Sequence, residues 1–339
     1  MKKGIWLIQL GTPEAPTEKA CRKFLKEFLM DAKVIDIPFL FRWFLVHFII
    51  IPFRVKRVAI AYQSIWTSLG SPLRVFTERL IKKLEIRLSS HALVLLSMRY
   101  GRPSIPEIAK KFIDADVEEI LVLPLYPQYA DSSTGTALEL VRATLPSKIK
   151  LKIIYSFYDK DFYIRSVAKT AESISFEKYD GILMSFHGLP ERQIKKIDLN
   201  QSHCLKKNDC CEQNLKENQF CYRHHSVVTT QKLVKALNLP VEKVHLCFQS
   251  RLGRTPWIRP FTDEVIVDLA KKGAKRLLVF CPSFVADCLE TLEEIQIRNK
   301  ELFIENGGED LVLVPSLNDS DFWAESLSQF LLDELSSNR

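Results

Sequence analysis

The 339-residue sequence lacks the features that mark several common classes of protein. It has no basic tail and no cluster of basic and aromatic residues, so nothing in it predicts binding to nucleic acid. Its N-terminal stretch, MKKGIWLIQLGTPEAP, contains an apolar run too short for a signal peptide. Eight cysteines do not suggest a secreted disulfide scaffold in a chain this long. We therefore expect a cytoplasmic protein, whose net charge of +7 favours acidic small molecules or anionic lipid headgroups as partners.

The sequence also lacks an apolar run long enough to span a membrane. The longest candidate, FLFRWFLVHFIIIPF at 39–53, is interrupted by Arg42, His47 and Pro52 and is followed at once by RVKR at 54–57. Two interpretations remain open. The segment is either a helix packed on a core or an apolar surface that touches lipid or a hydrophobic ligand.

What the sequence does contain is a regular alternation of short apolar runs and amphipathic stretches. Parallel sheets with crossover helices are typical of this alternation, and 47% hydrophobic residues suffice for two domains with separate cores. The pattern predicts strands at 4–10, 93–98, 118–124, 151–155, 180–186, 243–247, 275–281 and 311–314. It predicts amphipathic helices at 104–114, 136–145, 163–174 and 288–303, and a last helix at roughly 320–335 that returns to the first domain.

The second half of the chain repeats the first. Three motifs recur in the same order after equivalent strands: LGTP (10–13) and HGLP (187–190), SMRYGRPSI (97–105) and QSRLGRTPWI (249–258), PQYADS (127–132) and PSFVADC (282–288). Two similar α/β halves suggest two domains that face each other across a cleft. Leu10 and His187 then occupy equivalent places and are expected to face one another.

The ends of the predicted strands carry the candidate chemistry. His187 ends the strand 180–186, and Asp287, Glu290 and Glu294 follow the strand 275–281 at spacings that place them on one helical face. An imidazole with a carboxylate can exchange protons near neutral pH and can hold a divalent first-row metal loosely. Simpler interpretations also fit, since acids in a first turn complement a helix dipole and a histidine can be satisfied by backbone.

Apolar and basic residues accompany these groups. Leu10, Tyr126, Tyr129, Trp257 and Phe284 lie at or just after strand ends, where aromatic residues are as often core as ligand-binding. Arg99, Ser250 and Arg251 lie in the repeated motif and can anchor carboxylates. A flat apolar slot with a basic rim and a loosely held metal suggests a porphyrin and its metallation.

These motifs resemble the ferrochelatases, which insert ferrous iron into a porphyrin late in haem synthesis. The similarity covers nearly the whole chain and runs through LGTPEAPT, SMRYGRPS, LPLYPQY, SFHGLPER, FQSRLGRTPW, TDE and FVADCLETLEE. It implies two Rossmann-like domains, each a parallel four-stranded sheet flanked by helices. Their expected bounds are 1–155 with the apolar segment 39–53, 156–316 with a cysteine-rich insertion at 197–225, and a C-terminal helix within 317–339 that packs back on the first half.

The resemblance also implies roles for individual residues. His187 would bind iron or receive pyrrole protons, and Glu290 would lie across the pocket as a second catalytic and metal-binding group. Glu294 would continue the acidic line as a third catalytic residue. Positions near the porphyrin propionates match Arg99, Tyr100, Ser250 and Arg251, and pocket walls match Tyr62, Tyr126, Trp257 and Phe284. The segment 39–53 matches a lip thought to dip into the membrane, so we expect peripheral attachment at its inner surface.

Two departures from the family pattern refine the expected activity. Cys288 stands where many relatives have histidine, which alters any proton path through that position. Leu10 stands where members acting on coproporphyrin have tyrosine, which favours protoporphyrin. The expected function is that of a lyase which inserts Fe²⁺ into protoporphyrin IX, giving protohaem and two protons. The alternatives are a coproporphyrin III ferrochelatase and a non-enzymatic porphyrin or haem carrier, and the oligomeric state is not predicted.

Four of the eight cysteines lie together in CLKKNDCCEQNLKENQFC (204–221). Cys204, Cys210, Cys211 and Cys221 are candidate ligands for an iron–sulfur cluster or zinc, although their spacing fits no standard motif. Some ferrochelatases carry a [2Fe–2S] cluster on internal cysteines, which makes that cluster the expected cofactor if one is present. The alternative is an exposed loop of reduced thiols.

Overall fold

The computed structural model describes residues 2–198, 202–207, 209–213, 215–253 and 255–337. The chain forms two compact units. Unit 1 consists of Met1–Tyr126, Asp131–Ser156 and Asn318–Arg339, and unit 2 consists of Pro127–Ala130 and Phe157–Leu317. In the described residues each unit contains a four-stranded sheet whose strands all run parallel.

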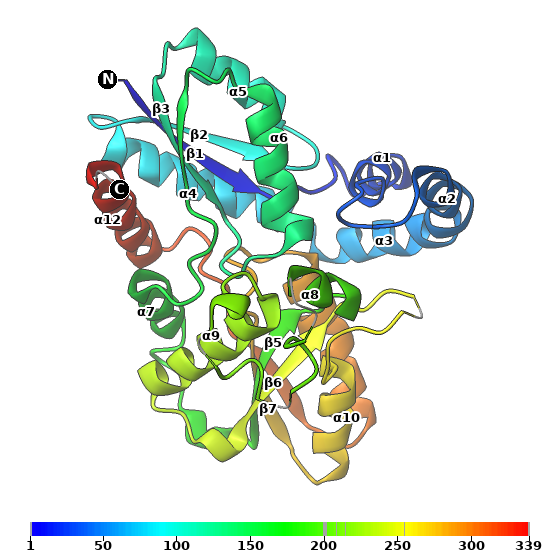
Figure 1. Ribbon diagram of the computed structural model, residues 1–339. Coiled ribbons are helices and arrows are strands. Elements are labelled where there is room, and N and C mark those ends of the chain that lie inside the picture. The colour runs from blue at the N-terminus through cyan, green and yellow to red at the C-terminus, as the bar shows by residue number, and fades with distance from the viewer. Residues whose placement is uncertain (1, 199–201, 208, 214, 254, 338–339) are drawn as a thin grey trace. The chain divides into compact units, whose positions relative to one another are not determined.

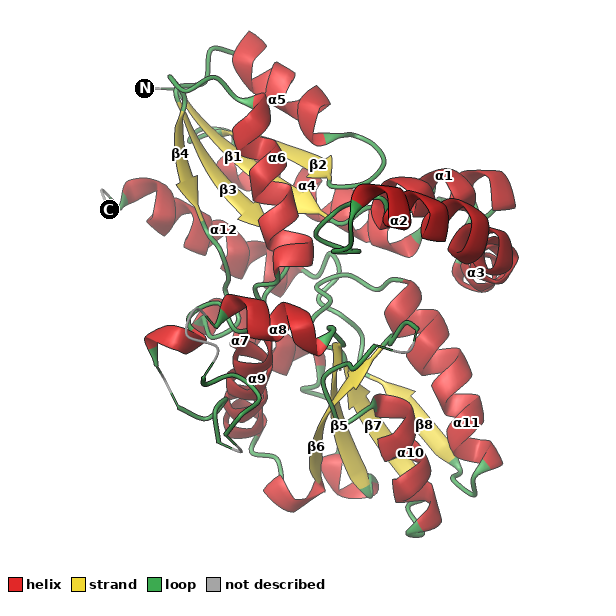
Figure 2. Ribbon diagram, turned by 45° about the vertical axis from the view of Figure 1, so that its right-hand side comes forward, coloured by secondary structure: helices red, strands yellow, loops and turns green. Residues whose placement is uncertain are grey.

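Unit 1 is built on a sheet with the strand order β2-β1-β3-β4. Its strands are β1 (Lys3–Gln9), β2 (Leu93–Met98), β3 (Glu119–Pro124) and β4 (Lys150–Ile153). Its helices are α1 (Glu18–Leu29), α2 (Phe39–Phe44), η1 (Leu45–Ile50), α3 (Ile51–Ile65), α4 (Pro72–Leu88), α5 (Ile105–Asp114), η2 (Asp131–Gly135), α6 (Thr136–Thr144) and α12 (Asp321–Ser336). Within this unit α5 and α6 cover one face of the sheet, and α4 and α12 lie on the other (Figure 2).

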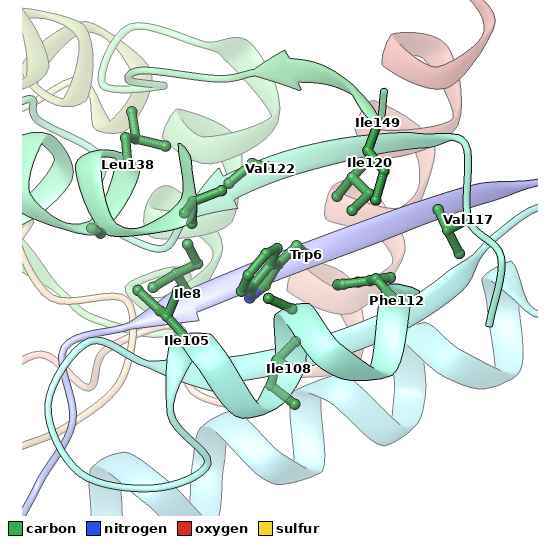
Figure 3. Close-up of a cluster of buried hydrophobic side chains, with 13 residues drawn as sticks. Trp6, Ile8, Ile105, Ile108, Phe112, Val117, Ile120, Val122, Leu138 and Ile149 are labelled. Atoms are coloured by element: carbon green, nitrogen blue, oxygen red, sulfur yellow. The ribbon is translucent and has the colours of Figure 1, made fainter. Parts of the chain in front are cut away.

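The core of unit 1 explains why the sequences of its strands are continuous apolar runs. Trp6 and Ile8 of β1 and Val122 of β3 face α5 and α6 (Figure 3), and the Trp6 and Phe112 ring centroids are 5.3 Å apart. The alternate residues face the other helical layer, so both faces of the sheet are buried. The one polar group of Trp6 is satisfied, because its Nε1 donates to Ser97 Oγ at 2.7 Å.

The C-terminal helix α12 belongs to unit 1. It packs on α4 and buries Trp323, Leu327 and Leu331. Lys83 of α4 pairs with Asp321 at 2.8 Å, and Lys152 of β4 pairs with Glu334 at 3.1 Å. The chain therefore leaves the first sheet after β4 and returns to it at its end.

Unit 2 has the strand order β6-β5-β7-β8. Its strands are β5 (Gly181–His187), β6 (Val244–Gln249), β7 (Arg276–Phe280) and β8 (Asp310–Leu313). Its helices are α7 (Asp161–Thr170), η3 (Phe176–Lys178), α8 (Glu191–Ile197), η4 (Lys216–Asn218), α9 (Tyr222–Leu237), η5 (Val241–Lys243), α10 (Thr262–Lys271), η6 (Leu289–Asn299) and α11 (Lys300–Glu305). In this unit α10 and α11 cover one face of the sheet, and α7 and α9 the other (Figure 2).

The predicted fold class is confirmed, and all eight predicted strands are present. The two sheets have the same order once β1 to β4 are matched with β5 to β8. One detail of the predicted repeat is wrong. The N–H of Met98 donates to Pro103 O and that of Phe248 to Pro260 O, so Arg99 corresponds in space to Gln249 and not to Arg251. The loop after β6 is longer than the loop after β2, and for this reason the match between the two sequence motifs was displaced.

The predicted helix 288–303 also differs in form. Its first part, η6, is a π-helix that begins at Leu289, and α11 continues it. Asp287 precedes the helix, and its Oδ1 accepts hydrogen bonds from Thr291 Oγ1 and Ser316 N. The predicted row of three acids on one helical face is therefore wrong, and Glu290 and Glu294 are the two that lie within η6.

The segment 39–53 forms α2, η1 and the start of α3, which group with α1 beside the sheet of unit 1 (Figure 1). Most of its large apolar side chains are exposed: Phe39, Leu40, Phe41, Trp43, Phe44, Phe48, Ile49 and Phe53. We call these eight residues the apolar lip. Of the two interpretations left open, the exposed apolar surface describes this segment. Within the described residues, no helix has both the length and the apolarity that crossing a membrane requires.

Candidate active site

His187 is the last residue of β5 and is half-buried at the carboxyl end of the sheet. Its Nδ1 lies 2.6 Å from the carbonyl oxygen of Gly188. A carbonyl can only accept, so Nδ1 carries a proton, and in the neutral imidazole Nε2 has the lone pair. The Phe284 ring packs against the imidazole with centroids 6.3 Å apart. His187 is therefore held in the tautomer that can accept a proton or bind a metal through Nε2.

The turn after His187 requires glycine. The N–H of Gly188 donates to Gln249 O at 2.7 Å, and a Cβ at position 188 would lie 2.8 Å from that oxygen and 3.3 Å from the Trp257 ring. Trp257 is fixed by a hydrogen bond from its Nε1 to Leu252 O at 2.9 Å. The predicted wall residue Trp257 thus lies directly beside the His187 turn.

Gln249 connects His187 to the acidic helix, and the sequence analysis missed it. It pairs with His187 across the sheet, and its Nε2 donates to the backbone oxygen of Glu290 at 2.7 Å. Its Oε1 accepts from Ser185 Oγ at 2.6 Å. Because this buried amide makes bonds on both sides, it holds the end of β5 and the start of η6 at fixed positions.

Cys288 immediately precedes η6 and is buried. Burial, reinforced by the neighbouring Glu290 carboxylate, raises the pKa of the Cys288 thiol well above its usual value. The thiol therefore stays protonated at neutral pH and hydrogen-bonds to Glu290. It cannot act as the proton acceptor that a histidine would provide at this position.

Glu294 is occupied by contacts to β6. Its carboxylate accepts from the N–H of Ser250 at 2.9 Å, from Ser250 Oγ, and from Gln249 Nε2 at 3.4 Å. Ser250 has a φ of 66°, a left-handed conformation that a residue other than glycine adopts only when its surroundings impose it. The structure thus brings Glu294 and Ser250 together, and Glu294 holds the strand end in shape.

Arg251, predicted to anchor a carboxylate of the ligand, is paired with acids of its own unit. Its guanidinium lies 2.7 Å from Asp263 and 3.2 Å from Glu264 and stacks on the Phe261 ring at 4.2 Å. A ligand carboxylate would have to compete with both acids. Its predicted contact with a propionate therefore stays a prediction.

In unit 1 Arg99 and Tyr100 are also paired internally. Asp31 Oδ2 accepts from Arg99 Nη2 at 2.5 Å, from Tyr100 Oη at 2.9 Å and from Thr136 Oγ1 at 2.5 Å. Burial alone would raise the pKa of Asp31, but the hydrogen bonds from Thr136 and from the N–H of Lys33, with the Arg99 charge, lower it. Asp31 was not predicted, because its partners follow it by 68 residues or more.

The remaining predicted wall residues lie in unit 1. Tyr126 is buried, and its hydroxyl has no hydrogen-bond partner among the described residues. Tyr62 of α3 is buried and packs edge-on against Trp66 with centroids 6.1 Å apart. Leu10 follows β1 and is half-buried, and its carbonyl accepts from the N–H of Tyr100 at 2.9 Å. An unpartnered buried phenol such as Tyr126 can still bind a polar ligand atom.

The four clustered cysteines form a buried sulfur core in unit 2. Cys210 and Cys211 Sγ atoms are 3.7 Å apart, Cys221 hydrogen-bonds to the thiols of Cys204 and Cys211, and Arg223 Nη1 donates to Cys211 Sγ at 3.1 Å. The predicted exposed loop of thiols is wrong, because each side chain is buried. The [2Fe–2S] cluster that the resemblance suggested as the other interpretation is not supported either. Among the described residues, no three His, Cys, Asp or Glu side chains are placed to hold a metal ion.

Solved structures of chelatases share the fold. SirB from Bacillus subtilis with Fe³⁺ superposes with a TM-score of 0.56 over 99% of this chain and 96% of that one, at 11% identity. The sirohydrochlorin chelatase SirB of Bacillus subtilis subspecies spizizenii in complex with cobalt gives a TM-score of 0.53 at 12% identity, over 100% of this chain and 97% of that one. At such low identity these matches show a common fold alone.

Sequence relatives are far more similar. A ferrochelatase of Coxiella burnetii (strain Dugway 5J108-111) is 44% identical over 97% of this chain and 92% of its own length. Ferrochelatases of Pseudomonas entomophila (strain L48) and Legionella pneumophila (strain Corby) are 42% and 40% identical, covering 95% and 99% of this chain and 96% and 100% of theirs. The family model described as "Ferrochelatase" matches residues 2–335. The chain therefore belongs to the ferrochelatase family, whose activity is the insertion of a metal into a porphyrin.

Proposed function

We propose that this protein inserts Fe²⁺ into protoporphyrin IX in haem biosynthesis, giving protohaem and two protons. The observation that carries the proposal is the tautomer of His187, whose Nδ1–H is bound by Gly188 O at 2.6 Å. In the neutral imidazole that bond leaves the lone pair on Nε2, at the carboxyl end of β5. Gln249, which pairs with His187 across the sheet, donates to the backbone oxygen of Glu290. An imidazole in this form and a carboxylate are the two groups that metallation needs.

The two groups have complementary roles. A porphyrin carries two pyrrole N–H protons, and both must leave as Fe²⁺ binds the four nitrogens. His187 Nε2 accepts one proton and the Glu290 carboxylate the other, after which both pass to solvent. As substrate, Fe²⁺ is held weakly by the same two groups before transfer, and the rigid walls formed by Trp257 and Phe284 favour a bent macrocycle.

Glu294 has a different role in this proposal. Its carboxylate is occupied by Ser250 and Gln249, so it acts by holding the end of β6 and only indirectly on the reaction. Ser250, Arg99, Tyr100, Arg251, Tyr126 and Tyr62 remain proposed substrate-binding residues. Arg99 and Arg251 would contribute by donating to a ligand carboxylate in place of the acids with which they are paired.

The choice of protoporphyrin is supported by Leu10. This apolar side chain lies at the end of β1. A tyrosine at this position would offer an oxygen to the metal or to coproporphyrin, which has more carboxylates than protoporphyrin. The test supplies Fe²⁺ anaerobically with either protoporphyrin IX or coproporphyrin III and follows the visible absorbance change. We expect faster metallation of protoporphyrin, and a preference for coproporphyrin would overturn the assignment.

The apolar lip supports a second part of the proposal, peripheral attachment to the inner surface of the cytoplasmic membrane. Its side chains are large and exposed, with Leu40, Phe41 and Phe53 each more than 70% accessible. Arg54, Lys56 and Arg57 follow directly and are exposed. Apolar side chains next to cations fit the interface of a bilayer that contains anionic lipid.

This attachment is tested by sedimentation with vesicles of phosphatidylcholine, with and without phosphatidylglycerol. We expect the double variant F41S/F53S to lose about tenfold in binding, since each phenyl ring removed from the interface weakens association. Ile86→Ser is the matched control, because Ile86 is 78% exposed on α4, outside the lip. Equal binding by the wild type and the double variant would rule the lip out as the attachment surface.

A further inference from the structure

The backbone of His187 is held by a hydroxyl from outside the sheet. The N–H of His187 donates to Ser283 Oγ at 3.2 Å, and Tyr222 Oη lies 2.8 Å from the same oxygen. Ser283 belongs to the loop after β7, and Tyr222 is the first residue of α9. A serine hydroxyl has two acceptor lone pairs and one proton, so both contacts can form at once. Three segments distant in the sequence therefore meet at one atom.

Tyr222 is fixed on both sides of this contact. Its side chain is 5% exposed, and its carbonyl accepts from Ser226 Oγ at 2.9 Å. The residue before it, Cys221, is 1% exposed and hydrogen-bonds to the thiols of Cys204 and Cys211. The first turn of α9 thus joins the sulfur core to Ser283, and through Ser283 to the end of β5.

We propose that Tyr222 and Ser283 are positioning residues, which hold His187 at its working position and connect it to the sulfur core. This proposal rests on the role proposed for His187 above. Neither side chain contacts the imidazole nitrogen that reacts, since both act through the backbone N–H. Reacting groups must be held to within about half an ångström, so a displaced strand end lowers the rate more than it lowers binding.

The first experiment compares Tyr222→Phe and Ser283→Ala with the wild type. We expect kcat to fall about fivefold to tenfold with KM unchanged, the loss that corresponds to one supporting hydrogen bond. Ser283→Thr keeps the hydroxyl and is expected to retain most of the rate. The control is Tyr179→Phe, which removes the phenolic hydroxyl of another buried tyrosine of unit 2, one that precedes β5 at the end opposite to His187. It should leave kcat near the wild-type value.

A spectroscopic measurement keeps the test independent of activity. Protein labelled with ¹⁵N-histidine contains seven histidines, and His187→Gln assigns the amide resonance of His187. We expect this resonance to shift in Tyr222→Phe and Ser283→Ala, and to stay in place in Tyr179→Phe. An unmoved resonance in the first two variants overturns the positioning role. A wild type that binds but never metallates porphyrin overturns the proposed function instead, and leaves this measurement valid.

The connection to the sulfur core is tested with Cys221→Ser in two backgrounds. In the wild type this substitution changes the thiol contacts next to Tyr222, and we expect a smaller shift of the same resonance. In Tyr222→Phe the route through the phenol is already broken, so Cys221→Ser should add no shift. An equal shift in both backgrounds would show that the sulfur core reaches His187 by another route, and would overturn this part of the proposal.

Discussion

The two halves of the molecule end their second strands in the same way but with different residues. In unit 1 Asp31 accepts hydrogen bonds from Arg99 and Tyr100 at the end of β2. In unit 2 Glu294 accepts from Gln249 and Ser250, which occupy the corresponding positions at the end of β6. The two acids come from unrelated elements, the loop after α1 and the π-helix η6. The repeated fold thus requires an acceptor at this place, whichever element supplies it.

The difference between the halves indicates where the chemistry lies. Unit 1 uses a full charge pair at its strand end and has the apolar Leu10 where unit 2 has His187. Unit 2 uses a neutral amide and a serine. Among the described residues His187 has no charged hydrogen-bond partner, and Gln249, which pairs with it across the sheet, donates to the backbone oxygen of Glu290. We infer that proton and metal transfer belong to unit 2, and that unit 1 contributes apolar surface and the lip.

The largest effect is expected from substituting the matched pair His187 and Leu10. His187→Ala removes a proton acceptor, and we expect kcat to fall about a thousandfold. Leu10→Ala removes only apolar contact and should change KM by less than about tenfold. Metallation is followed by absorbance and porphyrin binding by fluorescence quenching. Retained porphyrin binding without metallation in His187→Ala would exclude the carrier alternative. Equal losses of kcat in His187→Ala and Leu10→Ala would contradict the inference that proton and metal transfer belong to unit 2.

The next largest loss in kcat is expected from substituting the two acids of η6. Glu290→Gln removes a proton acceptor and should lower kcat about a hundredfold. Glu294→Gln keeps the size of the side chain but weakens its hydrogen bonds with Ser250. We therefore expect a lower free energy of unfolding, and a smaller loss in kcat than in Glu290→Gln. Steady-state kinetics and urea unfolding measure both quantities. The opposite order of kcat values would show that Glu294 is the reacting acid.

Asp31 is the counterpart of Glu294 in unit 1, and its loss should be structural. Asp31→Asn leaves the Arg99 guanidinium, whose side chain is 15% exposed, opposite a neutral amide. We expect the free energy of unfolding to fall by about 3 kcal/mol. Glu14→Gln is the control, because Glu14 pairs with Lys23 at the surface and should cost less than about 1 kcal/mol. Similar losses in both variants would mean that the buried pair does not stabilise unit 1.

The free energy of unfolding should also fall in mild acid, because of His225 in unit 2. Burial lowers the pKa of His225 to about 3, and its Nδ1 already accepts from the N–H of Tyr129 at 3.1 Å. The unfolded state binds the proton at higher pH, so stability is complete above about pH 6.5 and falls as the pH drops toward 3. The expected slope from this group is about 1.4 kcal/mol per pH unit. Urea unfolding of His225→Gln between pH 7 and pH 5 should show a shallower slope, and an unchanged slope would contradict the assignment.

The smallest effect concerns the sulfur core. Among the described residues no three His, Cys, Asp or Glu side chains are placed to hold a metal ion, so we expect anaerobically unfolded protein to titrate eight thiols, the number of cysteines in the sequence, and to release no acid-labile sulfide. The measurement combines thiol titration with sulfide analysis and visible absorption of the purified protein. Stoichiometric sulfide would show that the four cysteines rearrange to bind a cluster, and would restore the expectation drawn from the resemblance.

Much of the fold could be predicted because it depends on local pattern. Short apolar runs between turn residues marked all eight strands, and the motifs after them placed His187, Trp257 and Phe284 at one sheet edge. The register of the repeat could not be read correctly, since the loop from Phe248 to Pro260 is longer than that from Met98 to Pro103. The π-helical form of η6 was also missed, because an apolar period near four residues does not separate α- from π-helix.

The amino-acid sequence by itself determined the order of strands and helices, the internal repeat and the ferrochelatase family, because each depends on residues close together in the chain. Only the tertiary structure decided which acids are free and which are occupied. Asp31 meets Arg99 across 68 residues and Glu294 meets Ser250 across 44, and no spacing in the sequence encodes those contacts. The physical reason is that a buried carboxylate takes whichever donors packing brings to it.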